Sequence, residues 1–362
     1  MEIKKSIAII GGGTAGLSLA YNLTQIGHDF KLFERSDGLH DNGLGFLIMA
    51  NGLKLLKQMG LHQQVCDQGV LIDEYVSHHK TTGNTSKTNI GDCLAISRED
   101  FLNTIKVNLN KEQLFFNKKL IEIEVDQESK KKKLTFQDGH TEEFDIVVAS
   151  DGFHSDLRNF LFPGHPKQLV PYKEVVGMYK DKNTVAALQH QFIKFNDPES
   201  GFNVGIIPGN TDTVLWFIQM NVNKVKCPEN NQEAIKAFVK EISNHIPDEY
   251  NHILNNTETS KLYLWTLFNV DLVESFHVND IVLLGDAAHP LLSFTSQGVN
   301  SALEDSCLLS KLIINKESFE LFNEKRKPVI AEYLYEGRNL LDQFIHPEKY
   351  DNFKVPFIQL SK

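Results

Sequence analysis

The segment Ile281-Val-Leu-Leu-Gly-Asp-Ala-Ala-His289 places a short apolar run directly before a glycine and an aspartate, and we expect a helix to open near Gly298. A strand, a turn of small residues and a helix in this order are ordinary by themselves. The amino terminus repeats the arrangement, with Ile7-Ala-Ile-Ile10 followed by Gly11-Gly-Gly-Thr-Ala-Gly16. Two such turns, about 270 residues apart, predict one long ligand held at both ends.

The amino-terminal turn has the pattern Gly-x-Gly-x-x-Gly. The continuous apolar run before it is typical of a parallel strand that is covered on both faces. Gly11 permits a tight turn, Gly13 lets the backbone approach a pyrophosphate, and Gly16 lets the helix and the strand pack closely. The spacing of apolar residues after Gly16 indicates a helix that ends near Gly27.

The contacts expected around this turn are those of a dinucleotide. Phosphates are favoured at the helix N-terminus, near Thr14 and Ala15, where free N–H groups and the helix dipole attract anions. A second strand ends at Glu34-Arg35, and Glu34 lies 18 residues after Gly16, where an acid can accept hydrogen bonds from a ribose. The pattern does not decide between NAD and FAD.

Further motifs lie in the rest of the chain. Asp145 to Arg158 contains Asp-Gly-x-x-Ser-x-x-Arg, Ile96-Ser-Arg98 opens an expected helix, and Gly285-Asp-Ala-Ala-His289 follows a strand. Together they resemble the motifs of the class A flavoprotein monooxygenases, which have the p-hydroxybenzoate hydroxylase fold and include salicylate hydroxylase-like and tetracycline-inactivating enzymes. The resemblance runs from Ser6 to about Leu341.

The resemblance implies non-covalent FAD, with Asp286 on the ribityl chain, Arg98 reaching the flavin, and Asp151 and Arg158 at the boundary between FAD and NAD(P)H. It implies no metal and no catalytic side chain, because the flavin carries the chemistry. The residues expected to bind the cofactor are Gly11, Gly13, Thr14, Ala15, Gly16, Glu34, Arg35, Arg98, Val125, Asp151, Gly285, Asp286, Gly298, Val299 and Asn300.

The activity that the resemblance implies is hydroxylation of an electron-rich aromatic, phenolic or polycyclic small molecule. NADH or NADPH would act as a transient co-substrate, and O₂ would react at flavin C4a to give a hydroperoxide. Two positions depart from the family pattern at the reactive face: Ser293 stands where a proline is usual, and Ser296 where a glycine is usual. A flavin oxidase, reductase or halogenase, or a non-catalytic flavin-binding redox sensor, therefore stays an alternative.

The expected architecture is α/β, with a Rossmann-like FAD-binding domain around a parallel sheet and an inserted, mostly antiparallel substrate domain. The insertion is expected to contain strands over 174–179, 186–195, 201–207 and 213–220 and to close with a helix over 233–246. The FAD-binding domain is assigned to 1–71, 92–165 and 275–362, and the substrate-binding domain to 72–91 and 166–274.

Composition excludes several other classes of function. A net charge of −10 disfavours nucleic-acid and anionic-membrane binding, and no apolar run is long enough to span a membrane. Four scattered cysteines show no zinc-ligand spacing and suit a reducing cytoplasm, where we expect a monomer or weak dimer. Lys130 to Lys133 are expected to be a solvated hairpin tip, and His289 a structural residue, because one histidine without a partner makes no catalytic triad.

Overall fold

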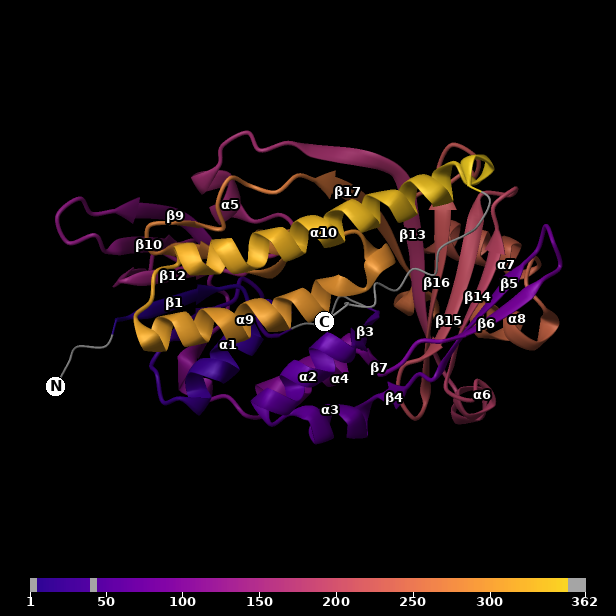
Figure 1. Cartoon of the computed structure of the whole chain (residues 1–362), viewed down its shortest axis with the longest axis horizontal. Helices are drawn as coiled ribbons and strands as arrows, with labels where there is room; N and C mark the ends of the chain where they lie inside the picture. The colour runs from indigo at the N-terminus through magenta and orange to yellow at the C-terminus, as the bar shows by residue number, and fades with distance from the viewer. Residues whose placement is uncertain (1–4, 40–43, 351–362) are drawn as a thin grey trace.

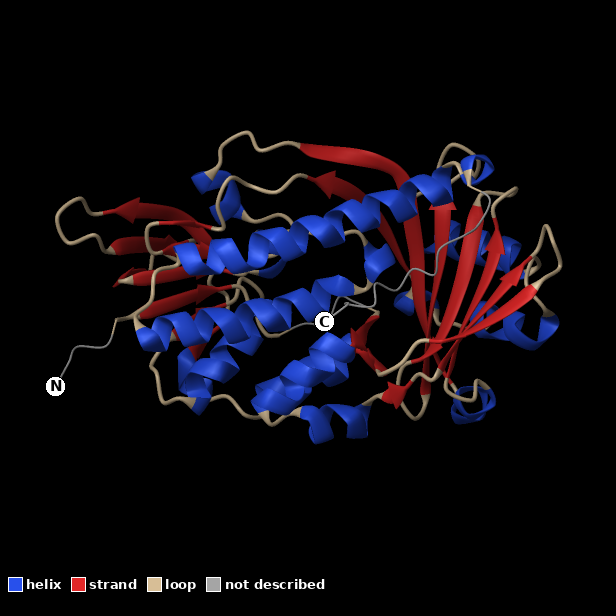
Figure 2. Cartoon of the chain, in the orientation of Figure 1, coloured by secondary structure: helices blue, strands red, loops and turns tan. Residues whose placement is uncertain are grey.

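The structure is a computed structural model that describes residues 5–39 and 44–350. Two large sheets stand toward opposite ends of the molecule, with most of the helices between them (Figure 1; Figure 2). The two longest helices, α9 (Gln297–Asn315) and α10 (Glu320–Ile345), pack on each other and run along the long axis. These helices connect the end with the first sheet to the end with the second.

The first large sheet has six strands in the order β18-β19-β12-β1-β2-β8. All neighbouring pairs are parallel except β18 and β19 at one edge. Its central strands are apolar and fully buried, which is the pattern of a parallel sheet covered on both faces. The strands are β1 (Ile7–Ile10), β2 (Lys31–Phe33), β8 (Leu114–Phe115), β12 (Ile146–Ala149), β18 (His277–Val278) and β19 (Ile281–Leu283).

The second large sheet has seven strands in the order β17-β13-β16-β15-β14-β5-β6. Every neighbouring pair is antiparallel except β14 and β5. The predicted α/β architecture, with a parallel sheet and a mostly antiparallel one, is therefore confirmed, while the domain boundaries stay a prediction. The strands are β5 (Glu74–His79), β6 (Thr85–Asn89), β13 (Lys167–Lys180), β14 (Gln191–Asp197), β15 (Phe202–Pro208), β16 (Thr213–Asn221) and β17 (Tyr263–Val270).

Two details of the second region differ from the prediction. The strand expected from Ala186 begins at Gln191, because α6 (Lys182–Ala187) occupies the residues before it, with the side chain of Asp181 capping that helix. The expected closing helix is α7 (Gln232–Ser243), but α8 (Asp248–Asn255) and β17 follow it. The last strand of the sheet thus comes after the helices and pairs with β13.

The remaining elements surround the first large sheet and the region between the two large sheets. Two small sheets have the strand orders β11-β10-β9 and β3-β7-β4. Their strands are β3 (Gly45–Met49), β4 (Val70–Leu71), β7 (Cys93–Ser97), β9 (Leu120–Val125), β10 (Lys132–Phe136) and β11 (Thr141–Phe144). The other helices are α1 (Thr14–Gln25), α2 (Ala50–Met59), α3 (His62–Gln68), α4 (Arg98–Lys106) and α5 (Asp156–Leu161).

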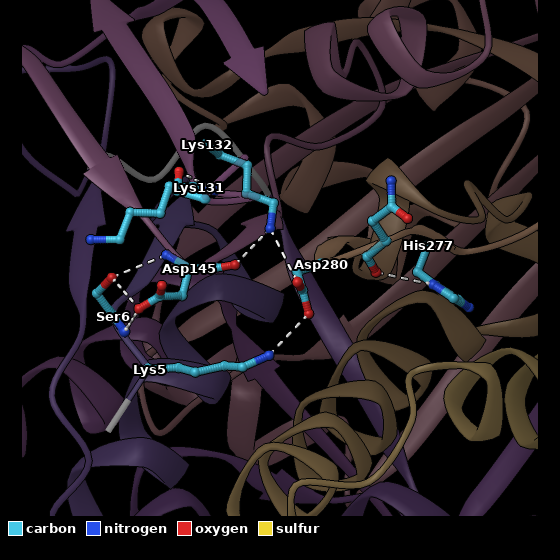
Figure 3. A network of polar contacts seen from close by, with 9 residues as sticks. Lys5, Ser6, Lys131, Lys132, Asp145, His277 and Asp280 are labelled. Atoms are coloured by element: carbon cyan, nitrogen blue, oxygen red, sulfur yellow. Dashed lines mark hydrogen bonds and ion pairs between the residues drawn. The ribbon is translucent and has the colours of Figure 1, made fainter. Parts of the chain in front are cut away.

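The lysine run at the predicted hairpin does not form a wholly solvated tip. Lys132 is 1% exposed, and its ammonium donates to the carbonyl of Asp145 at 2.7 Å and to the carboxylate of Asp280 at 3.2 Å. Lys5 reaches the same Asp280 carboxylate (Figure 3). The solvated interpretation is wrong for Lys132 because β10 begins there, so its side chain turns inward while Lys133, the next residue, faces solvent.

No helix in the described ranges combines the length and the apolar character needed to cross a membrane.

Candidate active site

A cavity of about 480 Å³ lies where the N-terminal ends of α1 and α9 face the seven-stranded sheet. The helix side supplies Gly13, Thr14 and Ala15 from α1 and its cap, and Gln297, Gly298 and Val299 from α9. The sheet side supplies Glu174, Val176, Phe192, Lys194, Ile207, Leu215, Phe217, Gln219 and Trp265. One space therefore joins a phosphate-binding type of turn to a largely apolar wall.

The glycine turn after β1 is packed as tightly as its sequence predicts. Gly11 has a φ of +106°, and a Cβ there would lie 2.4 Å from the carbonyl oxygen of Ser150. A Cβ on Gly16 would lie 2.0 Å from the Gly11 carbonyl oxygen. At Gly13, by contrast, the nearest atom to a Cβ would be Arg98 Nη2 at 3.8 Å, so this position leaves room for a ligand.

Both helix N-termini at the cavity are suited to negative charge. Neither α1 nor α9 has a side-chain cap or an acidic residue in its first turn. The N–H groups of a first turn have no partner within the helix, and the helix dipole adds positive potential there. Thr14 Oγ1 and Gln297 Nε2, one at each helix, are buried without a hydrogen-bond partner among the described residues. These atoms fit a polar ligand that spans both helices.

Glu34 lies beside the glycine turn, as an acid at the end of β2 should. Its Oε2 accepts a hydrogen bond from the N–H of Gly12 at 2.7 Å, and its Oε1 accepts one from Ser36 at 3.0 Å. These bonds hold the carboxylate in place at the turn. Arg35, the next residue, is exposed.

Arg158 joins the two aspartate-containing turns. Its guanidinium is fully buried and donates to the carbonyls of Asp286 at 2.9 Å, Ala287 at 3.0 Å and Phe153. The Asp151 carboxylate instead accepts from the backbone N–H groups of Asp156 and Leu157 at the start of α5. Burial raises the pKa of Asp151, although these hydrogen bonds lower it in part.

Asp286 presents its carboxylate to the cavity from the short 3₁₀ turn η3 (Gly285–Ala287). The side chain is open to the cavity but surrounded by protein, which raises its pKa, while the charges of His289 and Arg98 act in the opposite direction. Arg98 opens α4, lines the same cavity, and has its guanidinium 5.6 Å from the ring centre of Phe46. A carboxylate, from Asp286, and a guanidinium, from Arg98, thus both line the cavity near Gly13.

His289 has a partner that the sequence did not reveal. Its Nε2 donates to Asp305 Oδ2 at 2.6 Å, and the other oxygen, Oδ1, accepts from Arg326 Nε at 2.6 Å. Asp305 Oδ2 also accepts from the N–H of Gly285 at 3.0 Å. All of these side chains are buried, so the network joins α9, α10 and the turn that carries Asp286. It supports the structural interpretation of His289, and the expected lack of a partner is wrong.

Two residues expected at the cofactor are placed differently. Asn300 is fully buried on α9, and its side chain binds the backbone of β3: its Oδ1 accepts from Met49, and its Nδ2 donates to the carbonyl of Leu47. Val125 ends β9 and lines a separate hollow together with Lys132, away from the glycine turn. The Asn300 side chain therefore fixes the start of α9 against β3.

The sequence did not identify the polar residues on the sheet side of the cavity. Glu174, Lys194 and Gln219 lie on three different strands and line the cavity. Lys194 interrupts an apolar run between Phe192-Ile193 and Phe195, and Gln219 interrupts another between Ile218 and Met220, whereas Glu174 follows Lys173. A charged residue inside a buried strand was a usable signal, but only the sheet register shows that these residues share one face.

Ser296 gives a prediction about backbone strain. It caps α9 with a φ of +53°, a left-handed conformation that favours glycine. Ser296→Gly is expected to raise the free energy of unfolding by about 0.5–1 kcal/mol, because relief of strain exceeds the entropy cost of glycine. Urea unfolding measures the change. Ser301→Gly, inside the helix, should lower stability by a similar amount, and a destabilised Ser296→Gly would contradict the strain argument.

The comparison with protein families decides the family. The sequence model of a family described as "FAD binding domain" matches residues 4–327. The chain belongs to this family. The match includes both helix N-termini at the cavity, the turn with Asp286 and the cavity face of the sheet.

Relatives with assigned activities cover nearly the whole chain. The 3-amino-4-hydroxybenzoate 2-monooxygenase of Streptomyces cremeus is 26% identical over 94% of this chain and 88% of its own length. The 6-hydroxynicotinate 3-monooxygenase of Bordetella bronchiseptica is 26% identical over 86% of this chain and 83% of its own. Klebsiella pneumoniae HpxO, solved with FAD and uric acid, superposes with a TM-score of 0.84 at 17% identity, covering 95% of this chain and 90% of its own.

These comparisons confirm the predicted class A flavoprotein monooxygenase family and fold. The chain is an FAD-dependent oxidoreductase of the monooxygenase class. The tetracycline destructase Tet(51) shares the fold, with a TM-score of 0.71 at 20% identity over 95% of this chain and 92% of its own.

Proposed function

We propose that this protein uses NADH or NADPH and O₂ to hydroxylate an electron-rich aromatic small molecule. The supporting observation is the single cavity that joins two anion-favouring helix N-termini to an apolar, aromatic-containing sheet face. The names of the relatives, which hydroxylate a substituted benzoate and a hydroxynicotinate, agree with a small aromatic substrate. A ring held against Phe217 and Trp265 would face the helix side of the same cavity.

The residues at the cavity fit FAD. We assign the pyrophosphate to the glycine turn and α1, the adenosine ribose to Glu34, and the ribityl chain to Asp286. The flavin ring is assigned to the start of α9 at Gly298 and Val299, with Arg98 at its edge. The open space over Gly13 and the unpaired Thr14 and Gln297 atoms support this placement.

Bound flavin would supply electron transfer from NAD(P)H and the activation of dioxygen. The residues of the chain would bind the flavin and the substrate, orient them, and keep water out of the cavity. The N–H groups of the α9 first turn stabilise negative charge on the ring system, and the apolar sheet face excludes water. Asp151 and Arg158 are assigned to the boundary between FAD and NAD(P)H, where the buried Arg158 would act by holding the two turns together.

Labelled dioxygen tests the proposed activity directly. The FAD-loaded protein is supplied with NADH or NADPH, ¹⁸O₂ and a panel of phenols, aromatic acids and polycyclic compounds. Substrate-stimulated NAD(P)H consumption with ¹⁸O in an organic product is the expected result. Label found only in hydrogen peroxide or water across the panel would instead indicate a flavin oxidase, or a flavin-binding sensor that reacts with oxygen without a coupled substrate.

Asp286→Ala is expected to weaken FAD binding by about 1–3 kcal/mol, because a hydrogen-bonding partner of the ribityl chain is lost. The fold should stay intact, since no described residue bonds to this carboxylate and only the Asp286 carbonyl is used by Arg158. Flavin fluorescence titration measures the change. Asp271→Ala, which removes an exposed carboxylate paired with Arg338, is the control. Full FAD affinity in Asp286→Ala would reject the ribityl assignment.

A further inference from the structure

Lys194 is a buried cation in the cavity and has no partner among the residues that the structure describes. It lies on β14, is 6% exposed, and lines the cavity. In the described ranges it forms neither a hydrogen bond nor an ion pair, and the Glu174 charge acts on it only from a distance. Burial lowers the pKa of its ammonium to about 8. Buried charges are normally paired, so this unpaired charge indicates that the ligand carries an anionic group.

An aromatic surface lies next to this ammonium on the same face of the sheet. Lys194 is in register with Gly205 on β15, and Gly205 is in register with Phe217 on β16. A Cβ on Gly205 would come within 2.2 Å of the Phe217 ring, so the ring lies across the space that the glycine leaves. Val176 continues the row on β13. A flat ring can therefore pack beside Lys194.

The buried carboxylate nearby is already bound by the protein. Glu174 Oε1 accepts hydrogen bonds from Tyr172, from Gln219 at 3.3 Å and from Ser293 at 2.9 Å. Ser293 belongs to the short 3₁₀ turn η4 (Ser293–Thr295), which leads into α9. Glu174 thus ties the sheet to the flavin side of the cavity, and it forms no ion pair with Lys194.

The other charged residues of the cavity lie on the opposite wall. Arg98 opens α4 and Asp286 lies in η3, both beside the glycine turn. Asp286 is assigned to FAD, so it is not a counterion for the sheet face. Among the described sheet residues that line the cavity, Lys194 is consequently the one whose positive charge is available to a ligand.

We infer that Lys194 binds an oxyanion of the aromatic substrate, a carboxylate or a phenolate, while the ring packs against Phe217. This inference rests on the proposed function for the role of the cavity, but it makes a separate statement about the charge of the ligand. The substrate class is then an aromatic acid or an ionised phenol, and a neutral aromatic of the same shape binds less tightly.

The test compares binding of matched probes to the FAD-loaded full chain by isothermal titration calorimetry. Benzoate is paired with neutral benzamide, and ionised 4-nitrophenol with nitrobenzene. The test variant is Lys194→Met, which keeps the length of the side chain and removes the charge. The control is Lys173→Met, since Lys173 lies next to Glu174 on β13 and therefore faces the other side of the sheet.

Wild type is expected to bind at least one anionic probe about tenfold or more tightly than its neutral partner. Lys194→Met should lose that preference with the neutral probes unchanged, and Lys173→Met should keep it. A preference for benzoate identifies a carboxylate, and one for 4-nitrophenol identifies a phenolate. The inference is overturned if wild type prefers neither anion, or if the preference survives in Lys194→Met.

Urea unfolding without ligand separates binding from a structural role. Removal of an unpaired buried charge should raise the unfolding midpoint of Lys194→Met, whereas a lower midpoint would overturn the inference by assigning Lys194 to the fold. Calorimetry needs no turnover. Anion binding that depends on Lys194, without ¹⁸O in any product, would therefore reject the proposed function alone.

Discussion

Asp305→Ala is expected to lower the free energy of unfolding by about 3–5 kcal/mol, the range found when one partner of a buried ion pair is removed. Asp305 is fully buried and accepts hydrogen bonds from Arg326, His289 and the N–H of Gly285. Its loss leaves the Arg326 charge buried with Glu304, at 2.6 Å, as its one remaining ion-pair partner among the described residues. Urea unfolding at neutral pH measures the change.

Glu304→Ala is the matched control, because Glu304 precedes Asp305 on α9 and pairs with the same arginine from a position that is 37% exposed. Its expected cost is at most about 1 kcal/mol. Equal costs for the two variants would contradict the importance of the buried network.

The Asp305 contribution should also depend on pH in a defined direction. Burial alone would raise the pKa of Asp305, but the charges of His289 and Arg326 outweigh burial and lower it to about 2, from 3.8 in an unfolded chain. A depressed pKa stabilises the folded state above the unfolded value, and this stabilisation is lost as the pH falls toward about 2. The stability gap between wild type and Asp305→Ala should therefore narrow below about pH 4.

Gly16→Ala is expected to destabilise the protein by about 3 kcal/mol or more, because overpacking against backbone has no easy relief. The new Cβ would lie 2.0 Å from the Gly11 carbonyl oxygen and 2.6 Å from Ser150 Oγ. Ser150 Oγ donates to the carbonyls of Ile10 and Gly11, so it cannot move without breaking bonds at the end of β1. Urea unfolding of the flavin-free protein is the measurement.

Gly13→Ala separates packing from cofactor binding at the same turn. Its Cβ would meet nothing nearer than Arg98 Nη2 at 3.8 Å, so the flavin-free protein should keep nearly its full stability. FAD affinity should fall by about tenfold or more, because the methyl group occupies space assigned to the pyrophosphate. The assignment fails if Gly13→Ala binds FAD as wild type does, and the packing argument fails if Gly16→Ala unfolds like wild type.

The features that the sequence predicted are those carried by contiguous residues. The glycine turn after Ile10 and the turn at Gly285-Asp286 each lie between a strand and the next helix, and the acid at Glu34 directly follows β2. A tight turn restricts which residues fit, so the chemistry of the turn can be seen locally. Ser296 also belongs here, because the family resemblance marks it as a serine at a position where glycine is usual, and its φ is +53°.

The features that only the tertiary structure decided depend on residues far apart in the chain. Asp305 meets His289 and Arg326 because α9 packs on α10, and Lys132 is buried because β10 brings it to Asp280. Lys194, Phe217 and Glu174 share a cavity through the register of a sheet whose strands are separated by loops and helices. A shift of one residue in register would turn each side chain to the other face, and that register is set by long-range packing that no single segment encodes.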